Sequence, residues 1–336
     1  MSGPRTVLLG ALVGVSLVAS ACGQDLTVGD DGGSQATCAD YPSKDVTLIV
    51  GRSPGGGHDE DARFYAPLLE KELGTNVIVE NIDGAGGRVA AEEMTTAEPD
   101  GYTIHLMEPM GLAALQLVED TRYDVRKYTH LGRFKVRPTV FAVGGDSEIT
   151  TFEELVRAGH KRSLRFATAG VSDPNFVNGV IGAKATGMRF VPVPHEGSAE
   201  AITSVVRGDT DFTVFSGDTV AEAAEAGDLR GLVQFGQKPL GMLGDVPMAR
   251  DVGLEELQGE LTSALTLEAP PGLPGCVRRP LTRAVQDALA NKKLDDFEAE
   301  GRIVTPGTPA EAEKVVNQAL ATYRRYTDVY EGQLTG

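Results

Sequence analysis

Apolar residues occur along this chain in short runs that alternate with longer stretches of helical spacing. The first run, Val46–Val50, is apolar and β-branched, as is typical of a buried strand. Residues 60–73 follow with the spacing of a helix. One stripe of that helix would carry Ala62, Tyr65, Leu68, Leu69 and Leu73. The glycines at 55–57 lie between strand and helix, an arrangement that favours binding of an anion or polar group by backbone N–H groups.

The same alternation continues through the chain and predicts an α/β fold. Strands at 77–80 and 102–107, with a helix at 88–97 between them, complete a βαβαβ pattern, which favours a mostly parallel sheet. Further strands are expected at 139–143, 164–168, 189–193, 211–215, 231–235 and 261–267, and further helices at 151–158, 175–186, 199–207, 278–290, 293–299 and 309–330.

This order predicts two α/β lobes joined by two hinge strands. The first lobe would comprise residues 41–143 and 268–333, and the second lobe residues 144–267. The strands at 139–143 and 261–267 would cross between the lobes. A cleft between two lobes is the plan of a binding protein.

The first 40 residues predict export. Arg5, an apolar stretch and small residues precede Cys22, so residues 1–21 have the pattern of a signal peptide. Cleavage before Cys22 would make it the lipidated first residue of a lipoprotein; the alternative is an ordinary signal peptide cut after Ala-Ser-Ala. Residues 22–40 are polar and glycine-rich, and we expect a flexible tether there. The protein is therefore expected outside the cytoplasmic membrane, anchored by lipid or periplasmic.

Charge and cysteine content limit the partners. The formal net charge of −17 argues against nucleic acid, which requires a basic face. With Cys22 lipidated, Cys38 and Cys276 remain for a disulfide in an oxidising compartment, or as two free thiols.

No motif for catalysis, a metal or a cofactor is complete. Gly55–Gly57 is followed by no phosphate-binding lysine, and Val89 occupies the last small position of a dinucleotide fingerprint at Gly84. The elbow-like segment 170–174 ends in Pro174, so a helix start is expected there instead of a nucleophile. The segment 58–61 is expected to be a solvated acidic first turn. We therefore expect neither an enzyme nor a cofactor.

A family resemblance rests on many segments in a constant order. Residues 53–59, Ser-Pro-Gly-Gly-Gly-His-Asp, with Ala62 and Arg63, are similar to the APGGGTD…AR signature of the tripartite tricarboxylate transporter receptors, the Bug-type solute-binding proteins. Further similar segments follow in order at 79–87, 99–103, 193–199, 207–211, 227–232, 245–247 and 268–272. The resemblance spans about residues 41–330.

The resemblance implies a two-lobed periplasmic-binding architecture of type II that closes on its ligand. Such a receptor would deliver a small organic acid to a membrane permease of two other subunits, and we expect it to be monomeric. A solute sensor for a signalling partner, or a secreted hydrolase or isomerase, are the alternatives. The residues that would hold the ligand are Ser53, Pro54, Gly55, Gly56, Gly57 and His58 on one side and Ala169, Gly170, Ser172, Gly197 and Ser198 on the other.

Departures from the family pattern bear on specificity. His58 replaces a usual threonine and His195 a frequent tyrosine, while Glu108 and Asp218 add carboxylates where small polar residues are common. We include all four as candidate ligand-binding residues. Two interpretations stay open for the acids: they cap helices or face solvent, or they bind a positive group of a zwitterionic ligand. Protonated His58 or His195 would instead offset an additional ligand carboxylate.

Overall fold

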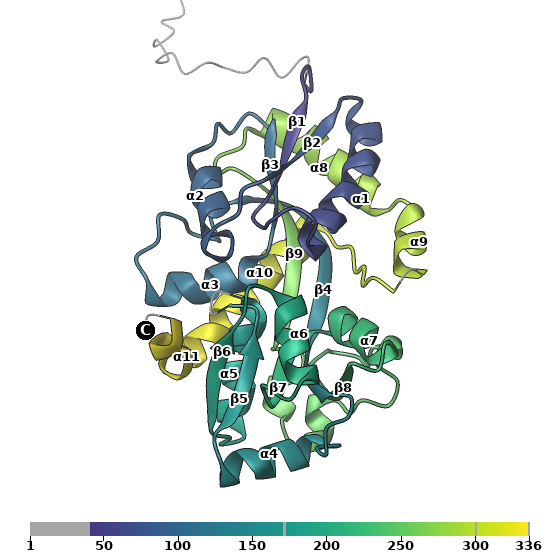
Figure 1. The fold of residues 1–336 in the computed structure, drawn as a ribbon. Coiled ribbons are helices and arrows are strands. Elements are labelled where there is room, and N and C mark those ends of the chain that lie inside the picture. The colour runs from purple at the N-terminus through teal and green to yellow at the C-terminus, as the bar shows by residue number, and fades with distance from the viewer. Residues whose placement is uncertain (1–40, 171–172, 300, 335–336) are drawn as a thin grey trace, which may run out of the picture. The chain divides into compact units, whose positions relative to one another are not determined.

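A computed structural model describes residues 41–170, 173–299 and 301–334, where strands and helices alternate (Figure 1). The strands are β1 (Val46–Val50), β2 (Val77–Asn81), β3 (Thr103–Met107), β4 (Thr129–Gly144), β5 (Leu164–Thr168), β6 (Phe190–Pro194), β7 (Phe212–Ser216), β8 (Leu229–Gln234) and β9 (Thr262–Ala269). The helices are α1 (Gly57–Leu73), α2 (Arg88–Thr96), α3 (Pro109–Val118), α4 (Phe152–Lys161), α5 (Pro174–Ala185), α6 (Ser198–Val206), α7 (Gly217–Glu225), α8 (Gly275–Leu289), α9 (Lys293–Ala299), α10 (Pro309–Arg325) and α11 (Thr327–Leu334).

The strands pair in the order β2-β1-β3-β9-β4-β7-β5-β6, and β8 also pairs with β4. β1 is parallel to both β2 and β3, which confirms the predicted βαβαβ unit. β5 is likewise parallel to β6 and β7, while β4 and β9 run antiparallel to their neighbours. The alternation of strands and helices therefore forms an α/β fold, as the sequence predicts.

Strand β4 passes from one half of the sheet to the other. Its residues Thr129–Pro138 pair with β9, and Thr139–Gly144 pair with β7 and β8. We call the elements β1, β2, β3, β9 and residues 129–138 of β4 the first half, and the elements β5 to β8 and residues 139–144 of β4 the second half. The prediction of a strand at 139–143 found only the apolar end of β4, because the earlier part carries charged residues at alternate positions.

Two helices were not predicted. α3 is almost entirely apolar and so lacks an amphipathic period; it begins with Pro109 directly after its N-cap, Glu108. α7 begins at Gly217 directly after the last residue of β7. The expected helix at 309–330 is interrupted at Tyr326, whose backbone is not helical, and is therefore two helices, α10 and α11.

The predicted helix starts near residue 151 and within residues 170–174 are confirmed. The Thr151 side chain accepts a hydrogen bond from the Glu154 N–H, and Asp173 accepts one from the Asn175 N–H ahead of α5. Ser172, which was expected beside this start, lies outside the described residues.

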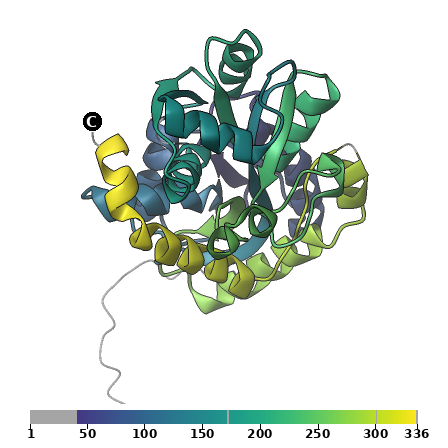
Figure 2. The same cartoon turned by 90° about the horizontal axis from the view of Figure 1, so that it is seen from below.

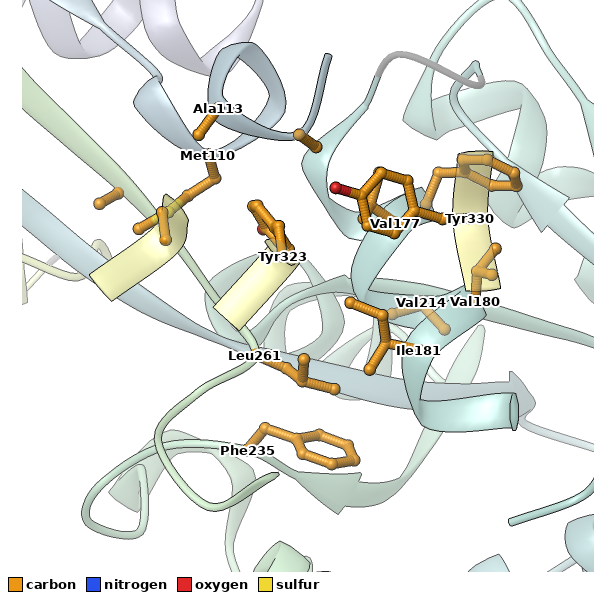
Figure 3. Close-up of a cluster of buried hydrophobic side chains, with 14 of the residues drawn as sticks. Met110, Ala113, Val177, Val180, Ile181, Val214, Phe235, Leu261, Tyr323 and Tyr330 are labelled. Atoms are coloured by element: carbon orange, nitrogen blue, oxygen red, sulfur yellow. The ribbon is translucent and has the colours of Figure 1, made fainter. Parts of the chain in front are cut away.

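The carboxy-terminal helices contact both halves. α10 packs against α3 and β4, and α11 packs against α5 and α3 (yellow in Figure 2). In the core, Tyr323 and Tyr330 lie beside Val177 and Ile181 of α5 (Figure 3). The Tyr323 hydroxyl donates to Asn178 Oδ1 at 3.0 Å, and Asn178 Nδ2 donates to Thr139 Oγ1 at 2.9 Å. This buried polar chain fixes the carboxy-terminal segment to the point where β4 changes halves.

Candidate functional site

The site begins with the alternation of side chains along β4. Residues 135–138 pair in regular register with β9, so successive side chains point to opposite faces of the sheet. Lys135 and Arg137 line a cavity of about 630 Å³, which we call the charged cavity. Gly57 at the start of α1 and Asp218 in the first turn of α7 also line it. The charged cavity therefore receives residues of the first half of the sheet and of α7, the helix that follows β7 of the second half.

Arg137 is buried but only loosely paired. Its Nε donates to Ser263 Oγ at 3.1 Å. Its terminal nitrogens lie 3.8 Å from Glu108 Oε2 and 4.0 Å from Asp218 Oδ2, which exceeds the length of a hydrogen bond. Within the described part of the chain these are the ion pairs that Arg137 makes. The guanidinium thus keeps donors for a group that enters the cavity.

Lys135, in contrast, has a close partner. Its Nζ lies 2.6 Å from Asp61 Oδ2, and both side chains are almost fully buried. Burial raises the pKa of the Asp61 carboxyl, and the charge of Lys135 opposes that rise.

This pair corrects the prediction of a solvated acidic turn at the start of α1. Asp61 is buried against Lys135, and buried Asp59 accepts hydrogen bonds from the Gly55 N–H and from Arg63. Glu60 between them is exposed. The prediction was wrong because the partner of Asp61 lies 74 residues further along the chain.

Glu108 and His58, two of the candidate residues, line a second, much smaller cavity. It measures about 10 Å³, and Arg52 and His105 also line it. Glu108 Oε1 accepts a hydrogen bond from the Met110 N–H at 3.1 Å, so Glu108 caps α3. Its Oε2 atom, like His58 Nε2 and His105 Nδ1, is buried without a hydrogen-bond partner in the described structure.

Burial is the largest influence on the pKa of Glu108 and of His58. It raises the pKa of the Glu108 carboxyl to about 7, against the opposing effect of Arg137. It also lowers the pKa of His58, and the nearby charge of Arg52 lowers it further. His58 is therefore neutral near pH 7 in this structure, and the hypothesis that a protonated His58 balances an additional ligand carboxylate stays a prediction.

The glycine loop leads into a helix without a side-chain cap. Gly56 is the N-cap of α1 and provides no side-chain acceptor, and Gly55 has a positive φ of 79°. Ser53 is exposed and its hydroxyl donates to Asp83, and Pro54 is exposed beside it. The first N–H groups of α1 therefore remain available near the charged cavity, which Gly57 lines.

A similar loop precedes α6 in the second half. Gly197, with a φ of 137°, is the N-cap of α6 and provides no side chain for capping, and Ser198 is exposed. The His195 N–H donates to the Thr168 carbonyl at 2.9 Å, and His195 Nε2 is buried without a described partner. Ala169 is partly buried and Gly170 has a φ of 112°. Ser172 is among the residues that the structure does not describe.

The structure brings together some of the candidate residues. Gly57 and Asp218 share the charged cavity, and His58 and Glu108 share the small one. Among the hydrogen bonds of the described residues, none joins residues 53–58 to residues 168–170 or 197–198.

Sequence reasoning missed Lys135, Arg137 and Arg52. Lys135 and Arg137 occupy alternate positions, with Val136 between them, and this pattern would have indicated a strand with one basic face.

Outside these cavities, the structure bears on the disulfide, on membrane-spanning helices and on metal-binding side chains. Cys276 is disulfide-bonded, and because Cys38 lies outside the described residues, their pairing stays a prediction. No described helix has the length and apolar character needed to cross a membrane. The described residues contain no group of three or more metal-binding side chains.

Comparison with solved structures identifies the fold class. The fold is similar to that of an R. palustris protein solved with adipate, with a TM-score of 0.76 and 23% identity over 87% of this chain and 99% of the other. It is also similar to MatC from Rhodopseudomonas palustris solved with malate, with a TM-score of 0.72 and 24% identity over 85% of this chain and 100% of the other. The fold is thus the two-lobed α/β architecture of periplasmic binding proteins, as predicted.

Sequence comparison identifies the family within that class. The family model described as the tripartite tricarboxylate transporter family receptor matches residues 62–318. A protein of Agrobacterium vitis, named "UPF0065 protein in the TAR-I ttuE-ttuC' intergenic region", is 30% identical over 74% of this chain and 72% of its own length. The chain belongs to the tripartite tricarboxylate transporter receptor family, a family of solute-binding receptors, and the resemblance seen in the sequence is confirmed.

Proposed function

We propose that this protein is an extracytoplasmic receptor that binds a small organic carboxylate at Arg137. The observation that carries the proposal is a buried guanidinium in a cavity between the two halves, with its terminal nitrogens 3.8 and 4.0 Å from their nearest carboxylates. Arginine binds a carboxylate through two parallel hydrogen bonds. A ligand carboxylate would therefore make shorter contacts with Arg137 than Glu108 or Asp218 does.

The surrounding backbone favours the same ligand class. The uncapped N-terminus of α1 borders the charged cavity at Gly57, and α6 begins at Gly197, also without a side-chain cap. Helix N-termini attract anions through their free N–H groups and the helix dipole. We propose that residues 53–58, 169–172 and 197–198 approach the ligand when the lobes close, with residues 41–143 and 268–333 in one lobe and 144–267 in the other.

The relatives support a small acid as ligand and transport as the role. Two proteins of the same fold were solved with adipate and with malate. The family description is that of a receptor for a tripartite transporter. We propose that this chain delivers its ligand to a two-subunit membrane permease, works as a monomer and performs no catalysis itself.

We further propose that lipid on Cys22 holds the receptor at the outer face of the membrane. Residues 22–40 would then be the tether between the lipid and the folded part. A Cys22→Ser variant should move the exported protein from the membrane fraction to the soluble fraction. If wild-type protein is already soluble, an ordinary cleaved signal peptide is the correct alternative.

The experiment for ligand binding is a thermal-shift screen with matched arginine variants. The panel contains malate, adipate, succinate and larger di- and tricarboxylates. An acid at a hundred times its Kd should add about 2.7 kcal/mol to the free energy of unfolding. Arg137→Gln should weaken binding of that acid by about tenfold to a hundredfold, because a hydrogen bond to a charged group is lost.

Arg157→Gln on α4 is the matched control, because Arg157 is exposed and pairs only loosely with Glu154, at 3.7 Å. It should bind the acid as wild-type protein does. Arg137→Lys keeps the positive charge but not the two parallel hydrogen bonds, and the melting temperature of each variant without acid reports whether it folds. Stabilisation by no acid in the panel, or equal binding by Arg137→Gln and wild-type protein, would contradict the proposal.

A further inference from the structure

Glu108 is a buried carboxyl with one satisfied oxygen and one unsatisfied oxygen. Its Oε1 accepts from the Met110 N–H at 3.1 Å and lies 3.4 Å from the Ala264 N. Its Oε2 atom is buried, has no hydrogen-bond partner in the described structure and lies 3.8 Å from an Arg137 nitrogen. The side chain is buried, with 4% of its surface exposed. A buried carboxylate oxygen without a hydrogen-bond partner is energetically costly. Binding of a proton or contact with a ligand group would remove this cost.

Charged and titratable groups surround Glu108 on several elements. Arg137 alone is within ion-pair distance of Glu108 among the described residues, and it is shared with Asp218 of α7, the helix that follows β7. Lys135 is already engaged by Asp61. The remaining groups near this cluster are Arg52 before α1, His58 in α1, His105 in β3, Asp173 before α5 and Tyr323 in α10.

A ligand carboxylate on Arg137 would be the third anionic group around one guanidinium. It would lie near Glu108 Oε2, which is itself 3.8 Å from that guanidinium. A like charge within about 4–6 Å favours the neutral form of a carboxyl. Burial already raises the pKa of Glu108 to about 7, so the proton is available from solvent near neutral pH.

We propose that Glu108 is a specificity-determining residue that enters the ligand complex protonated, so that binding of a carboxylate at Arg137 takes up a proton from solvent wherever Glu108 of the free protein is ionised. The Oε2–H group then donates a hydrogen bond to the ligand and leaves no unpaired charge beside it. This inference rests on the proposed function and names its ligand class: an ionised carboxylate without a cationic group next to Glu108.

A zwitterionic ligand would reverse this relation. An ammonium group beside Glu108 requires the ionised carboxylate, so such a ligand would release a proton and bind more tightly as the pH rises. The arrangement favours the carboxylate, because Arg137 already supplies a positive charge 3.8 Å from Oε2 and a second cation there would be repelled. Proton uptake on binding therefore indicates a carboxylate ligand, and proton release indicates a zwitterionic ligand.

The experiment is isothermal titration calorimetry of malate, adipate and succinate into the purified protein. At pH 8, titrations in phosphate and in Tris give the number of protons taken up, because the two buffers differ in ionisation enthalpy. We expect an uptake of about 0.8 proton per ligand, and an affinity about tenfold weaker at pH 8.5 than at pH 6.5. These acids are ionised throughout this range, so the proton is not theirs.

Two variants assign the proton to Glu108. Glu108→Gln keeps an oxygen for the Met110 N–H and should bind with no proton uptake and with an affinity independent of pH. Glu153→Gln, the same change at an exposed position of α4, should take up protons as wild-type protein does. The two-buffer measurement on wild-type protein does not depend on either variant folding.

Each result has a definite meaning. Binding without proton uptake, or unchanged uptake in Glu108→Gln, would overturn this inference and leave the proposed function intact. Affinity that rises with pH would overturn it in favour of a ligand cation beside ionised Glu108. Binding of none of the acids at any pH would overturn both proposals.

Discussion

The two faces of β4 around residues 135–138 differ sharply in chemistry. Lys135 and Arg137 point into the charged cavity of about 630 Å³. Val136 and Pro138 point to the other face, where they line a groove of about 670 Å³ together with Met110 and Ala319. We call this second space the back groove. Two spaces of similar size thus lie on opposite faces of one strand.

The comparison shows that cavity size does not identify the site. The charged cavity contains a buried guanidinium whose terminal nitrogens lie 3.8 and 4.0 Å from the nearest carboxylates, which is costly unless a ligand binds them. Val136 and Pro138 offer no donor or acceptor from their side chains. Arg133 of β4 also lines the back groove, but it already donates to the carbonyls of Thr305 and Pro306. We therefore assign function to the face of β4 with unsatisfied polar groups, while Val136 and Pro138 contribute packing to the back groove.

The largest expected effect comes from removing Lys135. Lys135→Met leaves Asp61 buried without its partner, and we expect the free energy of unfolding to fall by about 3–5 kcal/mol. Denaturant unfolding measures this. Asp61→Leu combined with Lys135→Met should recover most of the loss, because both charges are then gone.

The exposed pair of Lys44 and Asp100 provides the control for that prediction. Lys44 is 63% exposed and lies 3.6 Å from Asp100, so Lys44→Met should cost less than about 1 kcal/mol. If Lys135→Met and Lys44→Met cost the same, the charged face of β4 is not a buried ionic site.

A smaller effect is expected from Glu108 as the pH changes. Burial raises the pKa of its carboxyl from 4.5 to about 7 in the folded protein, so the folded state binds more protons than the unfolded chain between these values. The contribution of Glu108 to the free energy of unfolding is therefore lost as the pH rises through this window, by about 3 kcal/mol.

Glu108→Gln has no such titration. Its stability relative to wild-type protein should rise by about that amount between pH 4.5 and pH 8, as measured by denaturant unfolding at each pH without ligand. The exposed change Glu153→Gln should show no comparable trend. A constant difference between Glu108→Gln and wild-type protein would mean that folding does not raise the pKa of Glu108.

The smallest effect on the free energy of unfolding is expected from Val136, which lines the back groove. Val136→Ala removes packing from the back groove, and we expect a loss of about 1 kcal/mol in the free energy of unfolding with the Kd for the carboxylate unchanged. Unfolding and calorimetry on the same preparation measure both. A weaker Kd with unchanged stability would show that the comparison between the two faces is wrong.

Local features explain what could be predicted from the sequence. The strand, glycine loop and helix from Val46 to Leu73 were predicted because apolar periodicity and glycine act within a few residues. The parallel pairing of β1 with β2 and β3 followed from the βαβ rule. The resemblance to the receptor family added the two-lobed fold.

Tertiary contacts explain what was missed. In the sequence, Lys135 and Arg137 have the spacing of one exposed face of a strand. In the structure both are buried, because β4 crosses between the two halves. The buried state of Asp61 depends on Lys135, and that of Glu108 on the packing of α3. Local sequence cannot encode partners that only folding brings together.

The central claim is that a carboxylate binds on the charged face of β4. Its most direct test is a crystal structure of the protein with the acid that gives the largest thermal shift. We predict a ligand carboxylate within hydrogen-bond distance of the Arg137 terminal nitrogens and near the start of α1. A ligand bound in the back groove, or in the charged cavity without contact to Arg137, would contradict the claim.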